Sequence, residues 1–144
     1  ELLDAGAHIV TGDDLYGGSW RLFERVRRRS MGLDFSYIDL TDLASVEAAI
    51  TDKTRMLWVE TPTNPLLDIA DIAALAGLAH DAGALLVVDN TFASSYLQQP
   101  IALGADIVVN TDGDNQSPRS ASATSSSRSS PAAPTSSSRA AWNR

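Results

Sequence analysis

The sequence predicts an α/β fold with a mostly parallel sheet and flanking helices. Apolar runs without alternation, at residues 56–59 and 85–88, are typical of strands buried on both faces. Segments with helical periodicity lie between such runs, and Gly or Pro marks many of the boundaries. Because strands and helices alternate regularly along the chain, the strands should be mainly parallel and joined by right-handed crossovers.

The expected elements follow one another from the first residue to about residue 109. Strands are expected over residues 7–10, 34–38, 56–59, 85–88 and 105–109. Helical segments are expected over residues 1–3 (the end of a helix), 20–29, 42–50, 68–82 and, as a short helix, 96–103. Ser19 is the expected N-cap of the second segment, with Trp20, Phe23 and Val26 or Arg27 on adjacent turns. Thr41 or Asp42 is the expected N-cap of the third.

The central unit, residues 55–91, organises the rest of the chain. Its turn over 61–65 contains two prolines that a helix cannot cross. Asp68, with Asp71 three residues later, predicts the start of a helix, and Gly83 predicts its end. Four apolar residues have the spacing of one buried helix face: Ile69, Ile72, Ala76 and Ala79.

Composition argues against several classes of function. The net charge is −7, with −9 in residues 1–111 and +2 in residues 112–144, and an acidic body argues against a nucleic-acid partner. We interpret the basic cluster of Arg25 and residues 27–29 as the solvated end of a helix. No apolar run approaches a membrane span, and no leader is expected at the start. The absence of cysteine fits a reducing compartment, and we expect a cytoplasmic protein.

Residues 112–144 differ in character from residues 1–111. They are rich in Ser, Ala, Arg and Pro, and Trp142 is their only large apolar residue. Such a segment cannot bury enough surface to offset its ordering entropy, so disorder is expected. Because the change falls directly after a strand, we interpret the segment as out-of-frame or otherwise aberrant sequence fused to a truncated domain. A real linker is the alternative.

Three residues are expected to converge at the carboxyl edge of the sheet, where open α/β sheets bind ligands. Asp89 ends one strand, Asn64 follows the neighbouring strand, and Tyr16 lies on a loop with Gly17 and Gly18, whose small size lets the backbone approach another group. An acid, an amide and an aromatic ring suit a planar, nitrogen-containing cofactor. A purely structural alternative is that Asp89 caps the following turn through Thr91.

Three segments carry a resemblance to a known family: DLYGGSWRLF, VETPTNPLLDI and VVDNTFASSYLQQPIALGADIVV. Residues 1–109 resemble the Cys/Met-metabolism enzymes that use pyridoxal phosphate, the cystathionine γ-synthase and γ-lyase group. The resemblance implies that residues 1–111 are part of the large domain of the aspartate-aminotransferase type (fold type I). It also implies pyridoxal 5′-phosphate as cofactor, a small amino-acid substrate, trans-sulfuration chemistry and a homotetramer.

The resemblance also assigns roles to the candidate residues. Tyr16 matches the tyrosine that stacks on the cofactor ring, Asn64 the asparagine beside the ring hydroxyl, and Asp89 the aspartate that pairs with the pyridine nitrogen. The carboxylate would favour the protonated, electron-withdrawing ring.

The chain departs from the family at the motif of the form HSxTK, whose lysine forms the Schiff base with the cofactor. Counting on from Asp89, Thr111 could replace the phosphate-binding serine, but Asp114 stands at the lysine position. The only lysine, Lys53, lies in a turn before a strand, where a surface role is expected. The sequence therefore predicts an inactive fragment with no catalytic residue, weak cofactor binding and doubtful assembly.

Two alternative functions are considered for the sequence. The first is a non-catalytic truncated product that folds partly or associates with full-length subunits. The second, an unrelated nucleotide-binding domain, lacks support because no GxGxxG or Walker pattern follows a strand. Synthase and lyase activities are not distinguished by these residues.

Overall fold

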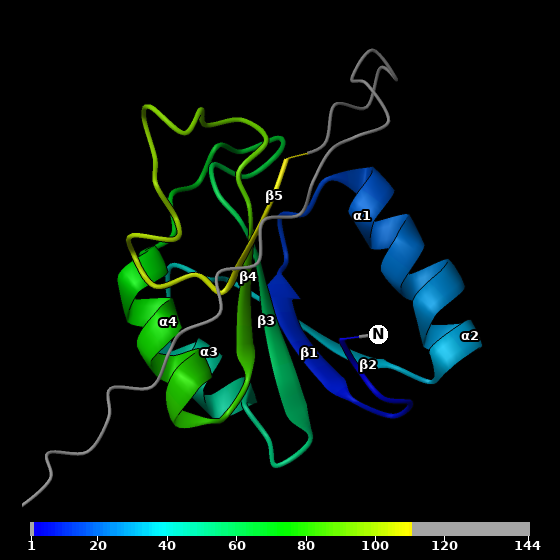
Figure 1. Ribbon diagram of the computed structural model, residues 1–144. Helices are drawn as coiled ribbons and strands as arrows, with labels where there is room; N and C mark the ends of the chain where they lie inside the picture. Colours follow the sequence, from blue (N-terminus) through cyan, green and yellow to red (C-terminus); the bar gives the residue numbers. More distant parts are fainter. Residues whose placement is uncertain (1, 111–144) are drawn as a thin grey trace, which may run out of the picture.

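A parallel sheet of five strands forms the centre of the protein (Figure 1). The structure is a computed structural model, and it describes residues 2–110. The strands are β1 (His8–Gly12), β2 (Asp34–Ile38), β3 (Thr54–Glu60), β4 (Leu85–Asp89) and β5 (Ile107–Val109). They lie in the order β2-β1-β3-β4-β5, and all four pairings are parallel. The predicted α/β class is therefore confirmed, and the strand ends agree with the expected ones to within two residues.

Helices cover both faces of the sheet (Figure 1). On one face, α1 (Gly17–Arg21), a π-helical segment η1 (Leu22–Arg27) and α2 (Arg28–Met31) follow one another without a break. On the other face lie α3 (Leu43–Ala49) and α4 (Ile72–Asp81). The layer of α3 and α4 buries several apolar residues against the sheet, whereas the first layer buries only Phe23. The strands are thus covered from both directions, as their apolar sequences predict.

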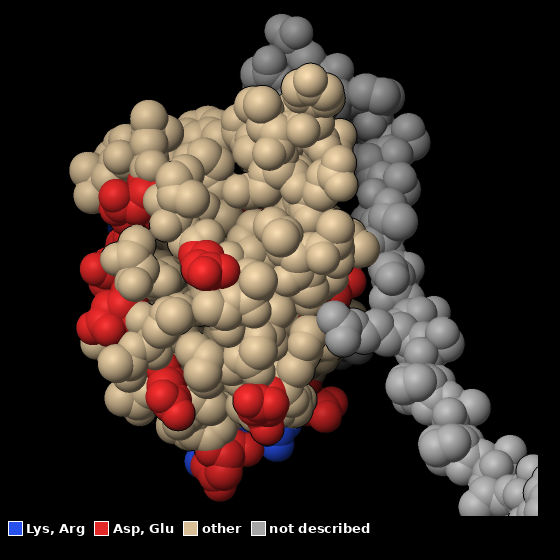
Figure 2. Space-filling model, turned by 90° about the vertical axis from the view of Figure 1, so that its left-hand side faces the viewer, with Lys and Arg blue, Asp and Glu red and all other residues tan. Residues whose placement is uncertain are grey.

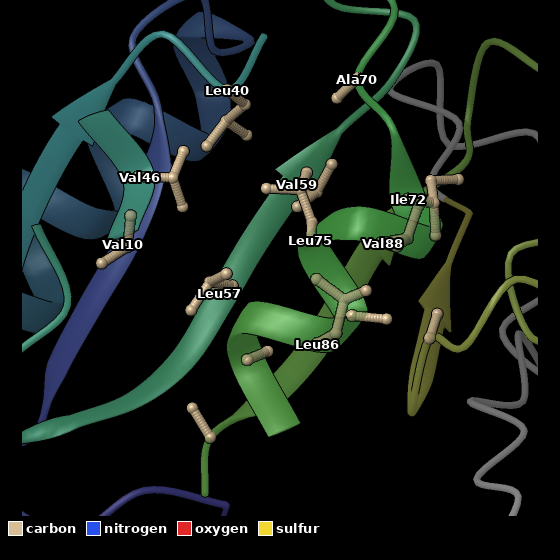
Figure 3. Close-up of a cluster of buried hydrophobic side chains, with 14 residues drawn as sticks. Val10, Leu40, Val46, Leu57, Val59, Ala70, Ile72, Leu75, Leu86 and Val88 are labelled. Carbon is tan, nitrogen blue, oxygen red and sulfur yellow. The ribbon is translucent and has the colours of Figure 1, made fainter. Parts of the chain in front are cut away.

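The larger core lies between the sheet and α3 with α4 (Figure 3). Figure 3 shows side chains from three central strands pointing toward α4 and α3: Val10, Leu57, Val59, Leu86 and Val88. Leu75 of α4 is fully buried among them. The smaller core, under η1, contains an aromatic group in which Phe23 stacks on Phe35 at 5.1 Å and meets Trp58 edge-on at 5.3 Å.

The strand order places a topological switch point between β1 and β3. From β1 the chain enters the α1–α2 layer on one face and returns to β2. From β3 it enters α4 on the opposite face and returns to β4 on the other side. The loops that follow β1 and β3 therefore diverge and leave a crevice at the carboxyl edge, which is where this class of sheet binds ligands.

Helix capping confirms one expectation and corrects another. Asp42 caps α3, since its side chain accepts hydrogen bonds from the Ala44 and Ser45 N–H groups. The expected cap at Asp68 is wrong, because Asp71 caps α4 by accepting from the Ala74 N–H. Asp68 belongs instead to a turn in which its N–H donates to Thr63 Oγ1 at 2.8 Å.

The first helical layer also differs from expectation. Tyr16, not Ser19, occupies the N-cap position, and no side chain caps the helix. Of the apolar residues expected on one face, only Phe23 is buried, whereas Trp20 and Val26 are more than two-fifths exposed. The wide π turn changes the phase of the side chains, which regular helical spacing does not predict.

Three further expectations are wrong. The chain over residues 96–103 forms turns rather than a short helix, and residues 2–3 are not helical. Ile69, expected on the buried face of α4, precedes that helix and is 63% exposed. The other three residues of that expected face, Ile72, Ala76 and Ala79, are buried.

The charged surface agrees with the acidic composition. The face that holds α3 and α4 shows scattered acidic side chains and little basic surface (Figure 2). The arginines of the basic cluster are exposed or partly exposed, and Arg28 forms ion pairs with Glu24 and Asp34. Among the described residues, no helix is long and apolar enough to cross a membrane. The expectations for residues 112–144 lie outside the described residues.

Replacing Leu75 should test how much of the stability comes from the larger core. Leu75→Ala should lower the free energy of unfolding by about 2–5 kcal/mol, because a fully buried leucine is lost and a cavity remains. Leu97→Ala, at a side chain that is 77% exposed, should change it by no more than about 0.5 kcal/mol. Urea denaturation followed by circular dichroism measures both. Equal effects would contradict the described core.

Candidate functional site

A pocket of about 160 Å³ opens at the carboxyl edge of the sheet, at the switch point. It is lined by residues from the loops or strand ends of β1, β3 and β4: Tyr16, Glu60, Pro62, Asn64, Asp89, Thr91 and Phe92. The structure thus brings Tyr16, Asn64 and Asp89 together, as the parallel topology predicts. Their assignment to a cofactor stays a prediction. Thr111 and Asp114 lie outside the described residues.

Asp89 is held firmly at the end of β4. Its side chain is only 6% exposed, and Oδ1 accepts hydrogen bonds from Thr91 N–H at 3.0 Å and Thr91 Oγ1 at 2.5 Å. The structural alternative, in which Asp89 caps the turn through Thr91, is therefore correct as a description of the local geometry. It does not exclude a ligand role, because a carboxylate has two oxygens and about four acceptor sites.

Glu60 is a pocket residue that the sequence reasoning did not select. It pairs in register with Asp89, so the two carboxylates lie side by side at the ends of β3 and β4. Glu60 is 7% exposed, and its Oε2 accepts the Tyr16 N–H at 3.0 Å. The available signal was that both apolar strands end in an acid, which in parallel neighbours places the acids together.

The pKa of Glu60 is raised above its ordinary value. Burial is the main cause, because it disfavours the charged form, and the nearby charges of Asp89 and Asp14 act in the same direction. The hydrogen bond from the Tyr16 N–H opposes them. The folded protein therefore holds a proton on Glu60 more tightly than the unfolded chain does.

Tyr16 forms one wall of the pocket, and its ring lies against Gly18. A Cβ atom at Gly18 would overlap the ring, at 3.0 Å from Cδ1 and 3.2 Å from Cζ. The sequence suggested that these glycines allow a close approach, and the approaching group at Gly18 is the side chain of Tyr16 itself. The ring remains 46% exposed, so a flat aromatic face is available at the crevice.

The loop after β4 is tied to the same edge by Gln98. Its Nε2 donates to the Thr61 carbonyl at 2.8 Å and to Asn90 Oδ1 at 2.7 Å. One side chain thus bridges the ends of β3 and β4. This fixes the start of the loop that supplies Phe92 to the pocket.

Lys53 lies at the opposite end of the sheet from the pocket. It is exposed and directly precedes β3, whereas Glu60 ends that strand. A strand of this length separates its two ends by about 20 Å, at roughly 3.3 Å per residue. Lys53 therefore does not reach the pocket, in agreement with the surface role expected for it.

Comparison with known proteins decides the family. The model of the family described as "Cys/Met metabolism PLP-dependent enzyme" matches residues 1–113. The chain belongs to this family. The resemblance inferred from the three sequence segments is thereby confirmed.

The family relatives include enzymes with different reactions. The chain is 54% identical over 109 residues to a cystathionine β-lyase of Coxiella burnetii, a match that covers 76% of this chain and 28% of the relative. It is also 54% identical over 108 residues to a cystathionine γ-lyase of Dictyostelium discoideum and to a cystathionine γ-synthase of Mycobacterium tuberculosis. Each of these two matches covers 75% of this chain and 28% of the relative.

Solved structures show the same fold. The cystathionine γ-lyase of Lactobacillus plantarum, complexed with L-serine, superposes with a TM-score of 0.72 at 53% identity. The match covers 74% of this chain and 28% of that one. The five-stranded sheet with its helices is therefore a piece of the fold type I architecture found in these pyridoxal-phosphate enzymes. The chain spans 28% of the length of each of the relatives named above.

Glu60 should make stability fall as the pH rises. The stabilisation that it contributes is complete below its ordinary pKa of 4.5 and is lost as the pH rises through the higher pKa of the folded state. Glu60→Gln should lack this loss, so its free energy of unfolding should rise relative to the wild type between pH 4 and pH 7.5. Urea denaturation across that range measures the difference.

The matched control is Glu47→Gln, on the exposed surface of α3. It should follow the wild-type pH dependence. A difference between Glu60→Gln and wild type that stays constant over the whole range would contradict the raised pKa.

Proposed function

We propose that the pocket at the β1/β3 switch point binds pyridoxal 5′-phosphate. The whole protein would then be a trans-sulfuration enzyme of sulfur amino-acid metabolism. The observation that carries the proposal is that Tyr16, Asn64 and Asp89 line one pocket in a chain of a pyridoxal-phosphate family. These are the residues that the family resemblance assigns to the cofactor ring.

The residues of the pocket fit such a ring chemically. The buried carboxylate of Asp89 would accept an N–H from the pyridine nitrogen and favour its protonated form. The Tyr16 ring would pack on the flat face, and the Asn64 amide would donate to the ring hydroxyl. When bound, the cofactor supplies an electron sink that stabilises negative charge at the α-carbon of an amino acid.

The substrate and setting follow from the same proposal. We infer a small amino-acid substrate, such as cystathionine or a homoserine ester, on which a γ-substituent is eliminated or replaced, as in methionine biosynthesis. The relatives named cystathionine γ-synthase, γ-lyase and β-lyase support this class. By the same family inference, the whole protein acts in the cytoplasm as a homotetramer.

We further propose that the 144-residue polypeptide has no turnover of its own. Turnover in this family requires a lysine amine at the cofactor, and the single lysine of the sequence lies at the other end of β3. The Asp114 side chain, at the position expected for that lysine, cannot act as a nucleophilic amine. The pocket residues would thus bind and orient the ring without a covalent link.

A second candidate, association with other protein chains, is supported by exposed apolar side chains near the pocket. They lie on the loops that follow β3 and β4: Leu66, Leu67, Ile69, Phe92, Tyr96 and Leu97, each more than half exposed. An apolar group of this kind is typical of a protein–protein contact. On this reading the chain would act as a non-catalytic product that joins full-length subunits.

Asp89→Asn should weaken non-covalent binding of pyridoxal phosphate about 10- to 100-fold. A charged hydrogen bond is typically worth about 1.5–3 kcal/mol, and the amide loses the negative charge that favours a protonated ring. Titration followed by cofactor absorbance or protein fluorescence measures the affinity. Asp81→Asn, at an exposed residue at the end of α4, is the control and should bind like the wild type. Equal affinities in all three proteins would contradict the assignment.

Borohydride reduction tests the absence of a covalent link. After incubation with pyridoxal phosphate and reduction, peptide mapping should show no more label at Lys53 in the folded protein than in chain unfolded by urea. A Lys53→Arg variant gives the background of the method. Specific labelling of Lys53, together with release of a γ-substituent from an amino-acid substrate, would overturn the proposal of inactivity.

The apolar loops should promote self-association. Wild-type protein should sediment as concentration-dependent oligomers or aggregates, and the double change Tyr96→Ser with Leu97→Ser should reduce this because it removes two of the most exposed apolar groups. Leu2→Ser, at a residue that is 64% exposed outside these loops, is the control. A wild-type monomer that unfolds cooperatively and stays soluble on heating would contradict the expectation.

A further inference from the structure

Burial alone does not fix the orientation of the Tyr16 side chain. The ring is 46% exposed, and the residue stands at the N-cap position of α1 with φ −48° and ψ 128°. A half-exposed side chain at a helix start has few packing contacts to fix it. The position of its backbone must therefore come from other bonds.

One such bond comes from Glu60. Its Oε2 accepts the Tyr16 N–H at 3.0 Å, across 44 positions of sequence. Because Glu60 ends the central strand β3 and is 7% exposed, it gives the bond a rigid base. A carboxyl oxygen can accept this bond whether the group is ionised or protonated.

A second bond runs in the opposite direction, from the loop after β3 to the loop after β1. Asp14, two residues before Tyr16, accepts the Leu66 N–H through Oδ2 at 3.0 Å. The loop after β1 thus donates a hydrogen bond from Tyr16 to Glu60 on β3. It also accepts one from Leu66 on the loop after β3. This reciprocal pair holds together the segments that carry Tyr16 and Asn64, both of which line the pocket.

We propose that Glu60 is a positioning residue that, with Asp14, sets the aromatic wall of the pocket by holding the Tyr16 backbone. Gly18 completes the arrangement, because the ring lies where a side chain at that position would be. Glu60 acts here as a hydrogen-bond acceptor and does not touch the reacting atoms. The inference rests on the proposed function only for the identity of the ligand.

A different role for Glu60 gives a different result on substitution. If its charge contacted a cationic ligand directly, as its place beside Asp89 would allow, both Glu60→Gln and Glu60→Ala would lose binding. A positioning role requires only an acceptor, and the glutamine side-chain carbonyl provides one. The two substitutions therefore separate the roles.

The test reads the Tyr16 amide by NMR in ¹⁵N-labelled protein without ligand. Glu60→Ala should speed hydrogen exchange at that amide about tenfold, because one hydrogen bond is lost, and Glu60→Gln should restore most of the protection. Titration with pyridoxal 5′-phosphate should then show about tenfold weaker binding for Glu60→Ala and near wild-type binding for Glu60→Gln.

Asp42→Ala is the matched control for stability. It removes the cap of α3, on the far face of the sheet, and should not change the Tyr16 amide beyond the general loss of stability. If Glu60→Ala does not fold, Asp14→Ala and Asp14→Asn provide the same comparison through the Leu66 and Tyr16 amides. Asp14 is only partly buried, so these changes should be tolerated.

The outcomes separate this inference from the proposed function. An unchanged Tyr16 amide in Glu60→Ala, or equal loss of binding in the Ala and Gln variants, would overturn the positioning role even where the wild type binds the cofactor. A Tyr16 amide that responds as expected in a protein that never binds pyridoxal phosphate would support positioning and refute the proposed function.

Discussion

The parallel pairing of β3 with β4 is the constraint on which the site depends. Its register places Glu60 directly beside Asp89, at the carboxyl edge of the sheet, where the loop after β1 contacts the end of β3. Burial and the neighbouring charge of Asp89 raise the pKa of Glu60, and hydrogen bonds compensate for burying the two carboxyl groups. Thr91 supplies bonds to Asp89, and the Tyr16 N–H supplies one to Glu60. The same bonds that satisfy the acids also shape the pocket walls.

Much of this arrangement could be predicted from sequence because it follows from topology. Unbroken apolar runs identify buried parallel strands, and parallel strands bring their carboxyl ends to one edge. Asp89, Asn64 and Tyr16 could therefore be placed together before any coordinates. Glu60 was equally predictable by this reasoning, since it ends the neighbouring strand, but an acid next to a Pro-containing turn reads as a strand boundary rather than as a pocket residue.

The failures of sequence reasoning come from local competition between hydrogen bonds. Asp68 and Asp71 both have the spacing of an N-cap, and the choice depends on Thr63, which binds the backbone of Asp68 in a turn and delays the helix. The short helix expected at 96–103 does not form, and Pro100 in the middle of that segment gives a reason, because proline lacks a backbone N–H and disfavours the helical conformation of the residue before it. The hydrogen bonds from Gln98 to Thr61 and Asn90, which are distant in the sequence, are not predictable from periodicity.

The π turn between α1 and α2 has a consequence for how this layer could change in evolution. A wide turn accommodates one residue more than regular helical winding would, so η1 amounts to an insertion absorbed without a loop. Because the wide turn absorbs the extra residue, deleting one residue there would restore regular α-helical winding and leave the segment beyond it in nearly the same orientation. Arg28, which follows the turn, would then still face Asp34 at the start of the edge strand β2. The extra residue can therefore be lost without displacing the end of this layer from the outermost strand.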